Sequence, residues 1–446
     1  MQTSLRPDDL LEQVSRLRRA NQDFTRRFPG ESGARQPVHT VYGGAQLFRA
    51  DSTQKLGAVA LRALEEYAPD AATLAGALGL PAGPLADTVY ARVREKLGRE
   101  PVEDFRIDFE DGYGNRPDAE EDGHAVSVAG EVARGMAEGT LPPFLGIRVK
   151  TLNEELQGRS VRTLDLFLTA LLGATGGALP DNFVVTLPKV VSVEQVEFFV
   201  DVLRLLEDRT GLARGTLRFE VMVEAPQAIL SPDGHTLLPR ILDAGEGRIT
   251  GAHFGTYDYT AAVGITAGHQ RMRHPACDFA RHVMQVALAG TGVWLSDGST
   301  TVMPVPVYRG EALTEEQARE NRESVYGAWR MHYEDVRNSL VNGFYQGWDL
   351  HPAQLVTRYA AVFGFFLEGV DAAGRRLRNF VEKAAQATLV GDVFDDAATG
   401  QGLLNYFARG INCGALTEEE ARGRTGLALE ELRGRSFLQI LRNRRG

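Results

Sequence analysis

The sequence predicts an α/β fold of the (β/α)₈ barrel type, in which eight parallel strands alternate with helices. Short apolar runs typical of buried strands recur along the chain, and segments with apolar residues at every third or fourth position lie between them. Repeated βα units of this kind imply parallel strands, and a chain of 446 residues is long enough for one barrel with insertions.

Eight segments are expected to be strands of the barrel. They are residues 38–48, 105–109, 144–149, 183–187, 217–223, 249–254, 293–295 and 348–350. The clearest helices between them are residues 53–67, 119–136, 193–207 and 278–288. An open doubly wound sheet is the competing fold, but no Gly-x-Gly-x-x-Gly turn follows the first strand, where a dinucleotide site would lie.

Three segments lie outside this barrel pattern. Residues 8–28 have the apolar spacing of an amphipathic helix that we expect to pack as an N-terminal extension. Residues 69–99 are rich in Ala, Gly and Pro and predict a helical insertion after the first βα unit. We therefore expect an extension at 1–37, a catalytic barrel at 38–355 and a C-terminal helical segment at 356–446.

Composition indicates an enzyme of the cytoplasm. The chain is 43% hydrophobic and 24% charged, and its net charge of -10 argues against nucleic acid or anionic lipid as a partner. Cys277 and Cys413 are too few for a disulfide framework. We expect no membrane partner, because no secretory apolar segment begins the chain and no apolar run is long enough to span a bilayer.

Polar residues follow the expected strands, at the end of a barrel where reacting groups lie. The second strand ends in Asp108-Phe109-Glu110-Asp111-Gly112. The next strands end in or carry Arg148, Lys189 and Glu224 and the run Gly255-Thr256-Tyr257-Asp258, and Asp297 and His351 follow the seventh and eighth strands. Taken alone, an acidic group such as Glu110 and Asp111 is more often a solvated loop or a helix cap.

Glu224 and Asp258 are the most informative pair, because they follow successive strands and should face the same barrel mouth. Carboxylates that converge in this way repel each other unless a proton or a metal ion lies between them. Mg²⁺ (or Mn²⁺) is the expected ion, because Mg²⁺ takes oxygen ligands and is commonly held by only one or two carboxylates.

Arg148 and Lys189 each have two interpretations. Arg148 lies within an apolar run and needs an anion, which is either a structural carboxylate or the carboxylate of a substrate. Lys189 either extends its ammonium to the surface or acts in the site. His351, before Pro352, is expected to be a positioned structural histidine.

These motifs resemble those of the HpcH/HpaI aldolase and citrate lyase β-subunit superfamily, which includes malyl-CoA lyases. The resemblance covers residues 38–396 and rests on six stretches in the family's order. They are Asp108–Gly112, Arg148, Leu187–Val190, Val223–Ala225, Phe254–Asp258 with Gly264, and Leu350–Gln354. The chain departs from the family's pattern at Val149-Lys150, where the lyases usually have an asparagine two places after the arginine.

The resemblance implies a (β/α)₈ enzyme with magnesium on Glu224 and Asp258. Arg148, Glu110, Asp111, Gly255 and Thr256 would bind the substrate, and Arg148 and Lys189 would act in catalysis. Gly391-Asp392-Val393-Phe394-Asp395 is similar to a segment whose aspartate serves as acid or base in a neighbouring subunit. Asp395 would then act in trans in a homo-oligomer, a trimer or hexamer, although Asp396 next to it leaves the assignment open by one residue.

We therefore expect a Mg²⁺-dependent carbon–carbon lyase, related to aldolases and citrate lyases. Its partner would be a small carboxylic acid, a 2-oxo or 3-hydroxy dicarboxylic acid or its CoA thioester. Schiff-base chemistry at Lys189 is disfavoured, because nearby carboxylates would keep its amine protonated. The alternatives are a malate-synthase-like condensing enzyme and a non-catalytic metabolite-binding protein on the same fold.

Overall fold

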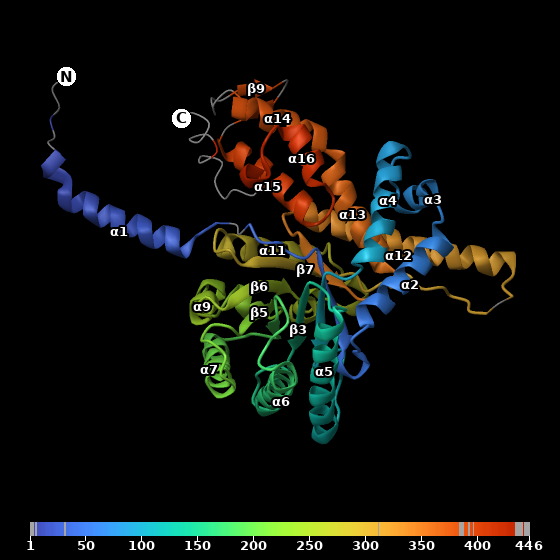
Figure 1. Cartoon of the computed structure of the whole chain (residues 1–446), viewed down its shortest axis with the longest axis horizontal. Helices are drawn as coiled ribbons and strands as arrows, with labels where there is room; N and C mark the ends of the chain where they lie inside the picture. The colour runs from blue at the N-terminus through green and yellow to red at the C-terminus, as the bar shows by residue number, and fades with distance from the viewer. Residues whose placement is uncertain are drawn as a thin grey trace.

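The structure, a computed structural model, contains the closed parallel barrel that the sequence predicts (Figure 1). It describes residues 4, 7–30, 33–310, 312–382, 388–390, 393–395, 397–432 and 440. The strands are β1 (His39–Gly44), β2 (Asp104–Asp108), β3 (Phe144–Arg148), β4 (Val184–Leu187), β5 (Arg218–Val223), β6 (Ile249–Phe254), β7 (Trp294–Ser299) and β8 (Gln346–Asp349). The ring closes because β1 pairs in parallel with both β2 and β8.

Helices follow the strands and cover the outside of the barrel. They are α2 (Ser52–Tyr67), α3 (Ala71–Leu78), α4 (Pro84–Arg99), α5 (Asp118–Glu138), α6 (Gln157–Thr175), α7 (Val193–Thr210), α8 (Pro226–Ile229), α9 (Leu238–Ala244), α10 (Thr256–Ala262), α11 (Pro275–Leu288), α12 (Glu315–Val341) and α13 (Gln354–Glu368). Side-chain caps fix the first turns of some of these helices. At α3 the Asp70 carboxylate accepts the backbone N–H of Thr73, and at α12 Thr314 and Gln317 form a reciprocal capping box.

Helices α3 and α4 occupy the segment expected to be an insertion after the first βα unit. Helix α13 follows the eighth strand and packs against α12, α4 and α2. It is buried along most of its length, so it completes the ring of helices. We therefore propose that the barrel domain extends through α13, beyond the expected boundary at residue 355.

The seventh strand differs from its prediction. It runs from Trp294 to Ser299, whereas the apolar pattern predicted only residues 293–295. Asp297 therefore lies within the strand, not after it, and its buried carboxylate accepts from Arg281 at 2.9 Å and from Ser339 at 2.6 Å. It belongs to the layer between β7 and its covering helices, because α11 carries Arg281 and α12 carries Ser339.

The interior of the barrel is ionic, which the apolar-run prediction missed. The guanidinium of Arg106 in β2 donates to Asp104 in the same strand and to Glu220 Oε2 in β5 at 2.8 Å. Strands β2 and β5 are not neighbours in the ring, so this contact crosses the lumen. Glu220 also pairs with His253 at 3.0 Å. All four side chains are buried, and the network satisfies charges that would otherwise be costly to bury.

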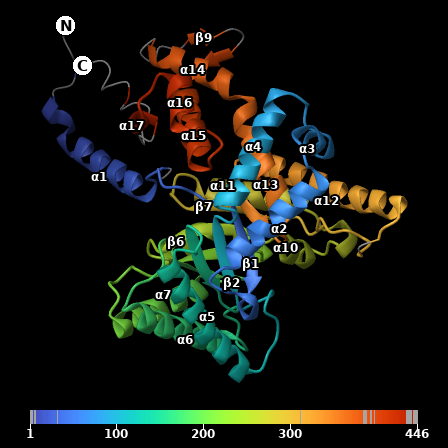
Figure 2. The ribbon, with the colours of Figure 1, turned by 45° about the vertical axis from the view of Figure 1, so that its right-hand side comes forward.

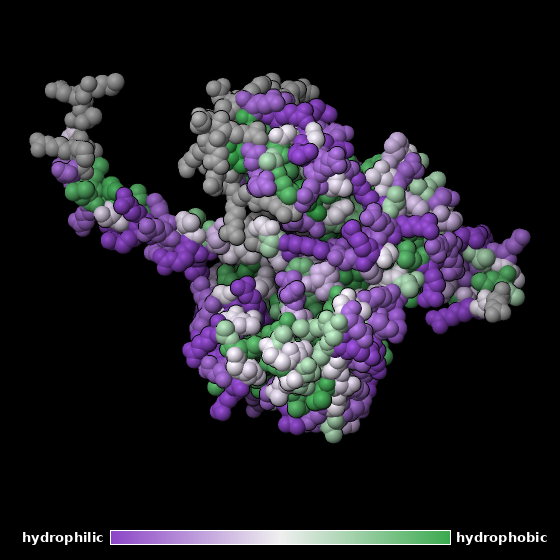
Figure 3. All heavy atoms as spheres, in the orientation of Figure 1, coloured by the Kyte–Doolittle hydropathy of each residue, from purple (hydrophilic) through white to green (hydrophobic). Residues whose placement is uncertain are grey.

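Helix α1 (Leu11–Arg27), preceded by the short turn η1 (Pro7–Leu10), corrects the expectation that this segment packs as an extension. No residue of α1 is buried. The helix extends away from the barrel (Figure 1), and hydrophobic residues are visible along it in the space-filling view (Figure 3). Leu17 is 60% exposed and Phe24 64% exposed. The amphipathic pattern therefore predicted the helix correctly, but its apolar face is exposed and does not pack on the barrel.

The C-terminal segment forms a second helical unit with its own apolar core. It contains α14 (Val370–Glu382), the hairpin strands β9 (Thr388–Val390) and β10 (Val393–Asp395), α15 (Ala397–Asn412), α16 (Glu418–Thr425) and α17 (Leu429–Leu432). Figure 2 shows α14, α15 and α16 together, on the other side of the strands from α5, α6 and α7. Among the described residues, no helix is both long and apolar enough to cross a bilayer.

Candidate active site at the barrel mouth

The carboxyl ends of the strands bring seven charged side chains together. We call this group the mouth cluster; its members are Asp108, Glu110, Asp111, Arg148, Lys189, Glu224 and Asp258. Six of them were expected as site residues, and Asp108 was seen only as part of an acidic run. Five carboxylates therefore lie close to two cations.

Arg148, the last residue of β3, forms a two-pronged pair with Asp108, the last residue of β2. Its Nε lies 2.7 Å from Asp108 Oδ1 and its Nη2 lies 2.5 Å from Asp108 Oδ2. The two residues are cross-strand partners in the β2–β3 register, so the fold sets them side by side. Of the two anions left open for Arg148, the structure supplies the structural carboxylate.

The remaining Nη1 of Arg148 is turned toward the acidic loop and lies 3.1 Å from Glu110 Oε2. The ring of Tyr42 covers the guanidinium, with its centroid 4.7 Å away. Sequence reasoning missed Tyr42. The sequence alone could not place it, because the register that pairs Tyr42 of β1 with Arg106 of β2, and so turns both to the inward face, is known only from the structure.

Lys189 lies between the acidic residues. Its Nζ is 2.5 Å from Glu110 Oε1, 3.3 Å from Asp111 Oδ2 and 3.8 Å from Asp258 Oδ2. Burial would lower the pKa of this amine, but the surrounding carboxylates raise it well above its usual value. Lys189 is therefore a cation at neutral pH, which leaves no free amine for Schiff-base chemistry.

The pKa values of the two carboxyl groups beside Lys189 are shifted in opposite directions. Burial raises the pKa of Glu110 above its ordinary value. Burial also acts on Asp111, but Arg148 and Lys189 outweigh it and hold the pKa of Asp111 below its usual range. Glu110 Oε2 is buried and accepts no hydrogen bond within the described part of the chain.

Glu224 follows β5 and is the most perturbed acid of the cluster. Its side chain accepts the backbone N–H of Lys189 at 2.7 Å, and Lys189 adopts φ of 50° at that position. Gly255 follows β6 and lies so close that a Cβ there would overlap the Glu224 carboxylate. Burial, together with the charges of Asp258 and Glu110, raises the pKa of Glu224 to about 8, although Lys189 opposes the shift.

Asp258 and Thr256 lie in the first turn of α10, directly after β6. The Asp258 carboxylate is half-exposed and opens toward solvent, with Lys189 as its cationic neighbour. Thr256 is buried and turned away, because its hydroxyl donates to Met272 Sδ at 3.3 Å. The structure therefore brings Asp258 and Gly255 to the cluster, but Thr256 supports the loop behind it.

His351 and Asp395 lie outside the cluster's hydrogen bonds. The His351 ring accepts the backbone N–H of Ala353 at 3.2 Å, and burial lowers its pKa, in keeping with the expected structural role. Asp395 ends β10, but its side chain is outside the described residues, and so is the whole of Asp396. The assignment of an acid or base to either residue stays a prediction.

An apolar pocket of about 240 Å³ adjoins the mouth. It is lined by β1, including Tyr42, and the residues that follow it, by Phe105 of β2, by the start of α2 and by the turn after β8. Tyr42 thus belongs both to the lining of this pocket and, through its ring, to the surroundings of Arg148. The arrangement therefore offers a site for anions and cations next to a space for an apolar group.

Three comparisons place this fold among known proteins. A family model described as a domain of unknown function (DUF6986) matches residues 17–440. The structure is similar to a citrate lyase from Burkholderia xenovorans LB400, with a TM-score of 0.56 and 18% identity over 88% of this chain and 96% of that one. At this identity the likeness shows the fold alone.

Two further likenesses carry less weight. Malate synthase from Haloferax volcanii has a TM-score of 0.47 and 15% identity, over 91% of this chain and 99% of that one. A bifunctional glyoxylate cycle protein from Caenorhabditis elegans is 36% identical over 73 residues, which are 16% of this chain and 7% of that protein. The chain thus matches only a small part of that relative's length.

Proposed function

The chain belongs to the family described as a domain of unknown function (DUF6986), and we propose that it is a divalent-cation-dependent carbon–carbon lyase. The proposed substrate is a 2-oxo or 3-hydroxy dicarboxylic acid or its CoA thioester. The observation that carries the proposal is the position of Glu224, whose buried carboxyl lies among the other carboxylates at the barrel mouth. A carboxyl with a pKa of about 8, next to further carboxylates, marks a place where positive charge is missing.

The mouth cluster suits a hard divalent cation. Its donors are carboxylate oxygens, which Mg²⁺ and Mn²⁺ prefer, and Glu224 and Asp258 would hold the ion. In the described part of the chain no three His, Cys, Asp or Glu side chains converge into a ready cage. Two carboxylates suffice for Mg²⁺, because its other positions are commonly filled by water and substrate.

When bound, such a cation supplies Lewis acidity worth several kcal/mol toward the negative charge that develops beside a carbonyl as a carbon–carbon bond breaks. The chain's own residues supply the rest. Arg148 and Lys189 bring positive charge to a substrate carboxylate, and Asp108 holds the Arg148 guanidinium in one orientation. Glu110 forms ion pairs with both Arg148 and Lys189 and so helps to fix the positions of these two side chains. The pocket beside Tyr42 offers room for the non-reacting part of the substrate.

The first test measures cation binding by thermal unfolding with Mg²⁺ or Mn²⁺. An ion at one hundred times its Kd stabilises the native state by about 2.7 kcal/mol, so the wild type should melt at a higher temperature. Asp258→Ala should abolish this shift while the protein stays folded. Asp201→Ala, which removes an exposed carboxylate outside the cluster, should keep it. An unchanged shift of the melting temperature in Asp258→Ala would show that Asp258 does not hold the cation.

The reaction itself is tested by incubating the protein and cation with a panel of 2-oxo and 3-hydroxy dicarboxylic acids and their CoA thioesters. Cleavage should release a smaller 2-oxo acid or a shorter thioester, and it should be lost with EDTA and in Asp258→Ala. Turnover only in the condensing direction would favour a malate-synthase-like enzyme. Saturable binding without turnover in either direction would favour the non-catalytic alternative.

Asp395 is proposed to serve as the acid or base of a neighbouring subunit. If so, Asp395→Ala and Asp258→Ala chains are each inactive alone, but co-expressed chains should regain part of the activity. Hybrid oligomers pair an intact cation site from one chain with an intact aspartate from another. Verified mixed oligomers without recovery would reject the role in trans, and full activity of Asp395→Ala alone would exclude this residue.

A further inference from the structure

Helix α1 carries an apolar stripe that the described part of the chain leaves exposed. Leu10, Val14, Leu17, Asn21 and Phe24 recur at alternating intervals of four and three residues, and each of these side chains is exposed. This spacing gives the narrow seam that packs on one other helix. Because most helical stability in proteins comes from packing of an amphipathic face, we expect α1 to have a partner surface.

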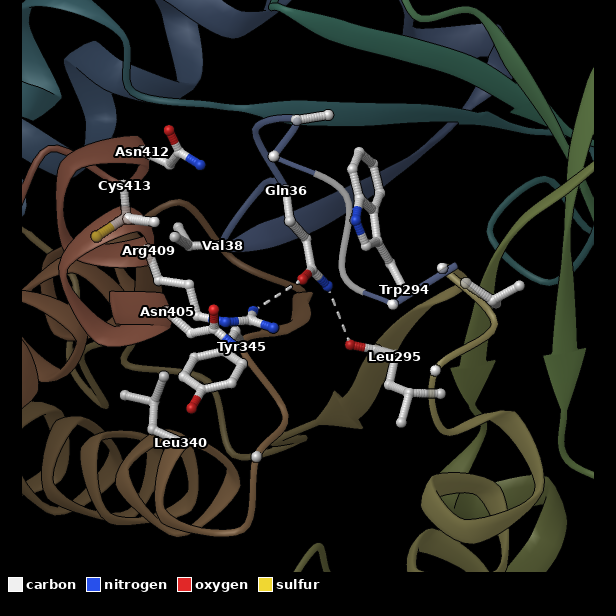
Figure 4. Close-up of a pocket in the computed structure, with 18 of the residues that line it drawn as sticks. Gln36, Val38, Trp294, Leu295, Leu340, Tyr345, Asn405, Arg409, Asn412 and Cys413 are labelled. Carbon is white, nitrogen blue, oxygen red and sulfur yellow. Dashed lines mark hydrogen bonds between the residues drawn. The ribbon is translucent and has the colours of Figure 1, made fainter. Parts of the chain in front are cut away.

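The segment that joins α1 to the barrel is fixed at both ends. At the end of the helix, Arg27 pairs with Asp243 of α9 at 2.9 Å. Just before β1, the Gln36 amide donates to Leu295 O at 3.2 Å and accepts from Arg409 (Figure 4). With these contacts in place, α1 extends away from the barrel in both views (Figures 1 and 2).

The exposed face of α7 matches this stripe in spacing. Phe198 and Leu205 lie seven residues apart and are 42% and 60% exposed, and Leu17 and Phe24 of α1 have the same interval. Helix α7 packs against α9, the helix that holds the end of α1 through Asp243. Figures 1 and 2 both show α1 extending away from α7, so it does not cover this face in its own chain.

The charges of α1 are mainly positive. The helix has five arginines and two acidic residues. Arg26 pairs with Asp23, and Arg27 pairs with Asp243. The other three arginines form no ion pair within the described residues; they are Arg16, Arg18 and Arg19. These three cations are therefore available for a partner surface.

The face of α7 carries acidic residues three or four positions from Phe198 and Leu205, so they lie beside these two side chains. They are Glu194, Glu197, Asp201 and Asp208. Asp201 pairs with Arg204 and Asp208 with Arg214. Glu194 and Glu197 form no ion pair within the described residues, although Arg240 of α9 contributes a positive charge near Glu194. The face therefore offers carboxylates where α1 offers arginines.

We propose that α1 is an exchanged arm, which packs its apolar stripe on the exposed face of α7 in a second copy of this chain. The α1 helix of that copy packs on this chain's α7 in return, and a two-fold axis closes the assembly as a dimer. The unpaired arginines of α1 then meet the carboxylates of α7. A membrane surface suits the helix less well, because Asn21 interrupts the narrow stripe. The proposal uses no residue of the mouth cluster and is independent of the lyase activity.

Sedimentation velocity on the full-length chain tests the exchange with two double variants. The arm variant carries Leu17→Gln and Phe24→Gln, and the face variant carries Phe198→Gln and Leu205→Gln. The wild type should associate, and each variant alone should associate at least tenfold more weakly. An equal mixture of the two variants should associate more tightly than either alone. The reason is that the intact arm of the face variant meets the intact face of the arm variant.

Val126→Gln is the matched control, because it replaces an apolar side chain of α5 that is 48% exposed, and it should associate like the wild type. Circular dichroism checks that each variant is folded, and the single variants Leu17→Gln and Leu205→Gln replace a double variant that is not.

Three sedimentation results would overturn the proposal: a monomeric wild type, association unchanged in both variants, or a mixture that associates no more tightly than its components. The last result, with association lost only in the arm variant, would indicate that two arms pair with each other. Binding of the wild type, but not of the arm variant, to vesicles of phosphatidylserine and phosphatidylcholine would also overturn it, because a membrane would then cover the stripe.

Discussion

Glu224→Gln is expected to remove most of the pH dependence of stability that the wild type shows between about pH 5 and pH 8 in the absence of divalent cations. The pKa of Glu224 rises from 4.5 to about 8 on folding, because the carboxyl is buried among other acids. Between these values the native state holds a proton that the unfolded state has released. The free energy of unfolding therefore falls as pH rises through this window, by roughly 4–5 kcal/mol, and is level again above pH 8.

Urea denaturation with EDTA at pH 5, 6.5 and 8 measures this effect. Glu207→Gln is a suitable control, because Arg248 and two backbone N–H groups hold the pKa of the buried Glu207 below its usual value despite desolvation. The stabilising effect of the Glu207 carboxylate is lost only below about pH 5. Glu207→Gln should therefore be less stable than the wild type but show the same dependence of the unfolding free energy on pH. A Glu224→Gln protein with the wild-type slope would show that the carboxyl is ionised in the native state.

Arg148→Met is expected to destabilise the protein by about 3–5 kcal/mol, which is typical when one partner of a buried ion pair is removed. The reason is Asp108, whose fully buried carboxylate would lose both guanidinium bonds and keep only the backbone N–H groups of Glu110 and Gly112. Urea denaturation at neutral pH gives the change directly.

The double variant with Asp108→Asn provides the control, because it removes the charge that the single variant leaves unpaired. It should recover part of the lost stability, and a double variant whose losses simply add would contradict the pairing. Arg148→Lys separates stability from function. Lysine keeps the positive charge but cannot make the two parallel N–H bonds of the guanidinium. If Arg148 also binds the substrate, turnover should fall steeply while the free energy of unfolding changes little.

Much of the barrel could be predicted because each strand carries a local signal. Apolar runs bounded by polar residues located all eight strands, and β6 has the predicted limits, residues 249–254. Glu224, Lys189 and Asp258 could be named as neighbours because parallel strands deliver their carboxyl ends to one face. Their convergence follows from topology and needs no knowledge of side-chain packing.

The residues that were missed depend on contacts across the ring. In β2 the sequence Asp104-Phe-Arg-Ile-Asp108 alternates, but only closure of the barrel shows that its polar face meets Glu220 of β5. The partner of Arg148 was left open for the same reason. The hydrogen bond from Arg409 to Gln36 joins residues 373 positions apart, and no local pattern predicts such a contact.

The ionic lumen also affects how stability responds to temperature. Most barrels fill this space with branched aliphatic side chains, whereas here it holds Asp104, Arg106, Glu220 and His253. Exposing apolar surface raises the heat capacity of unfolding, and exposing polar surface lowers it. Unfolding this lumen therefore adds little heat capacity, and the curve of unfolding free energy against temperature becomes flatter than for an aliphatic barrel of the same length.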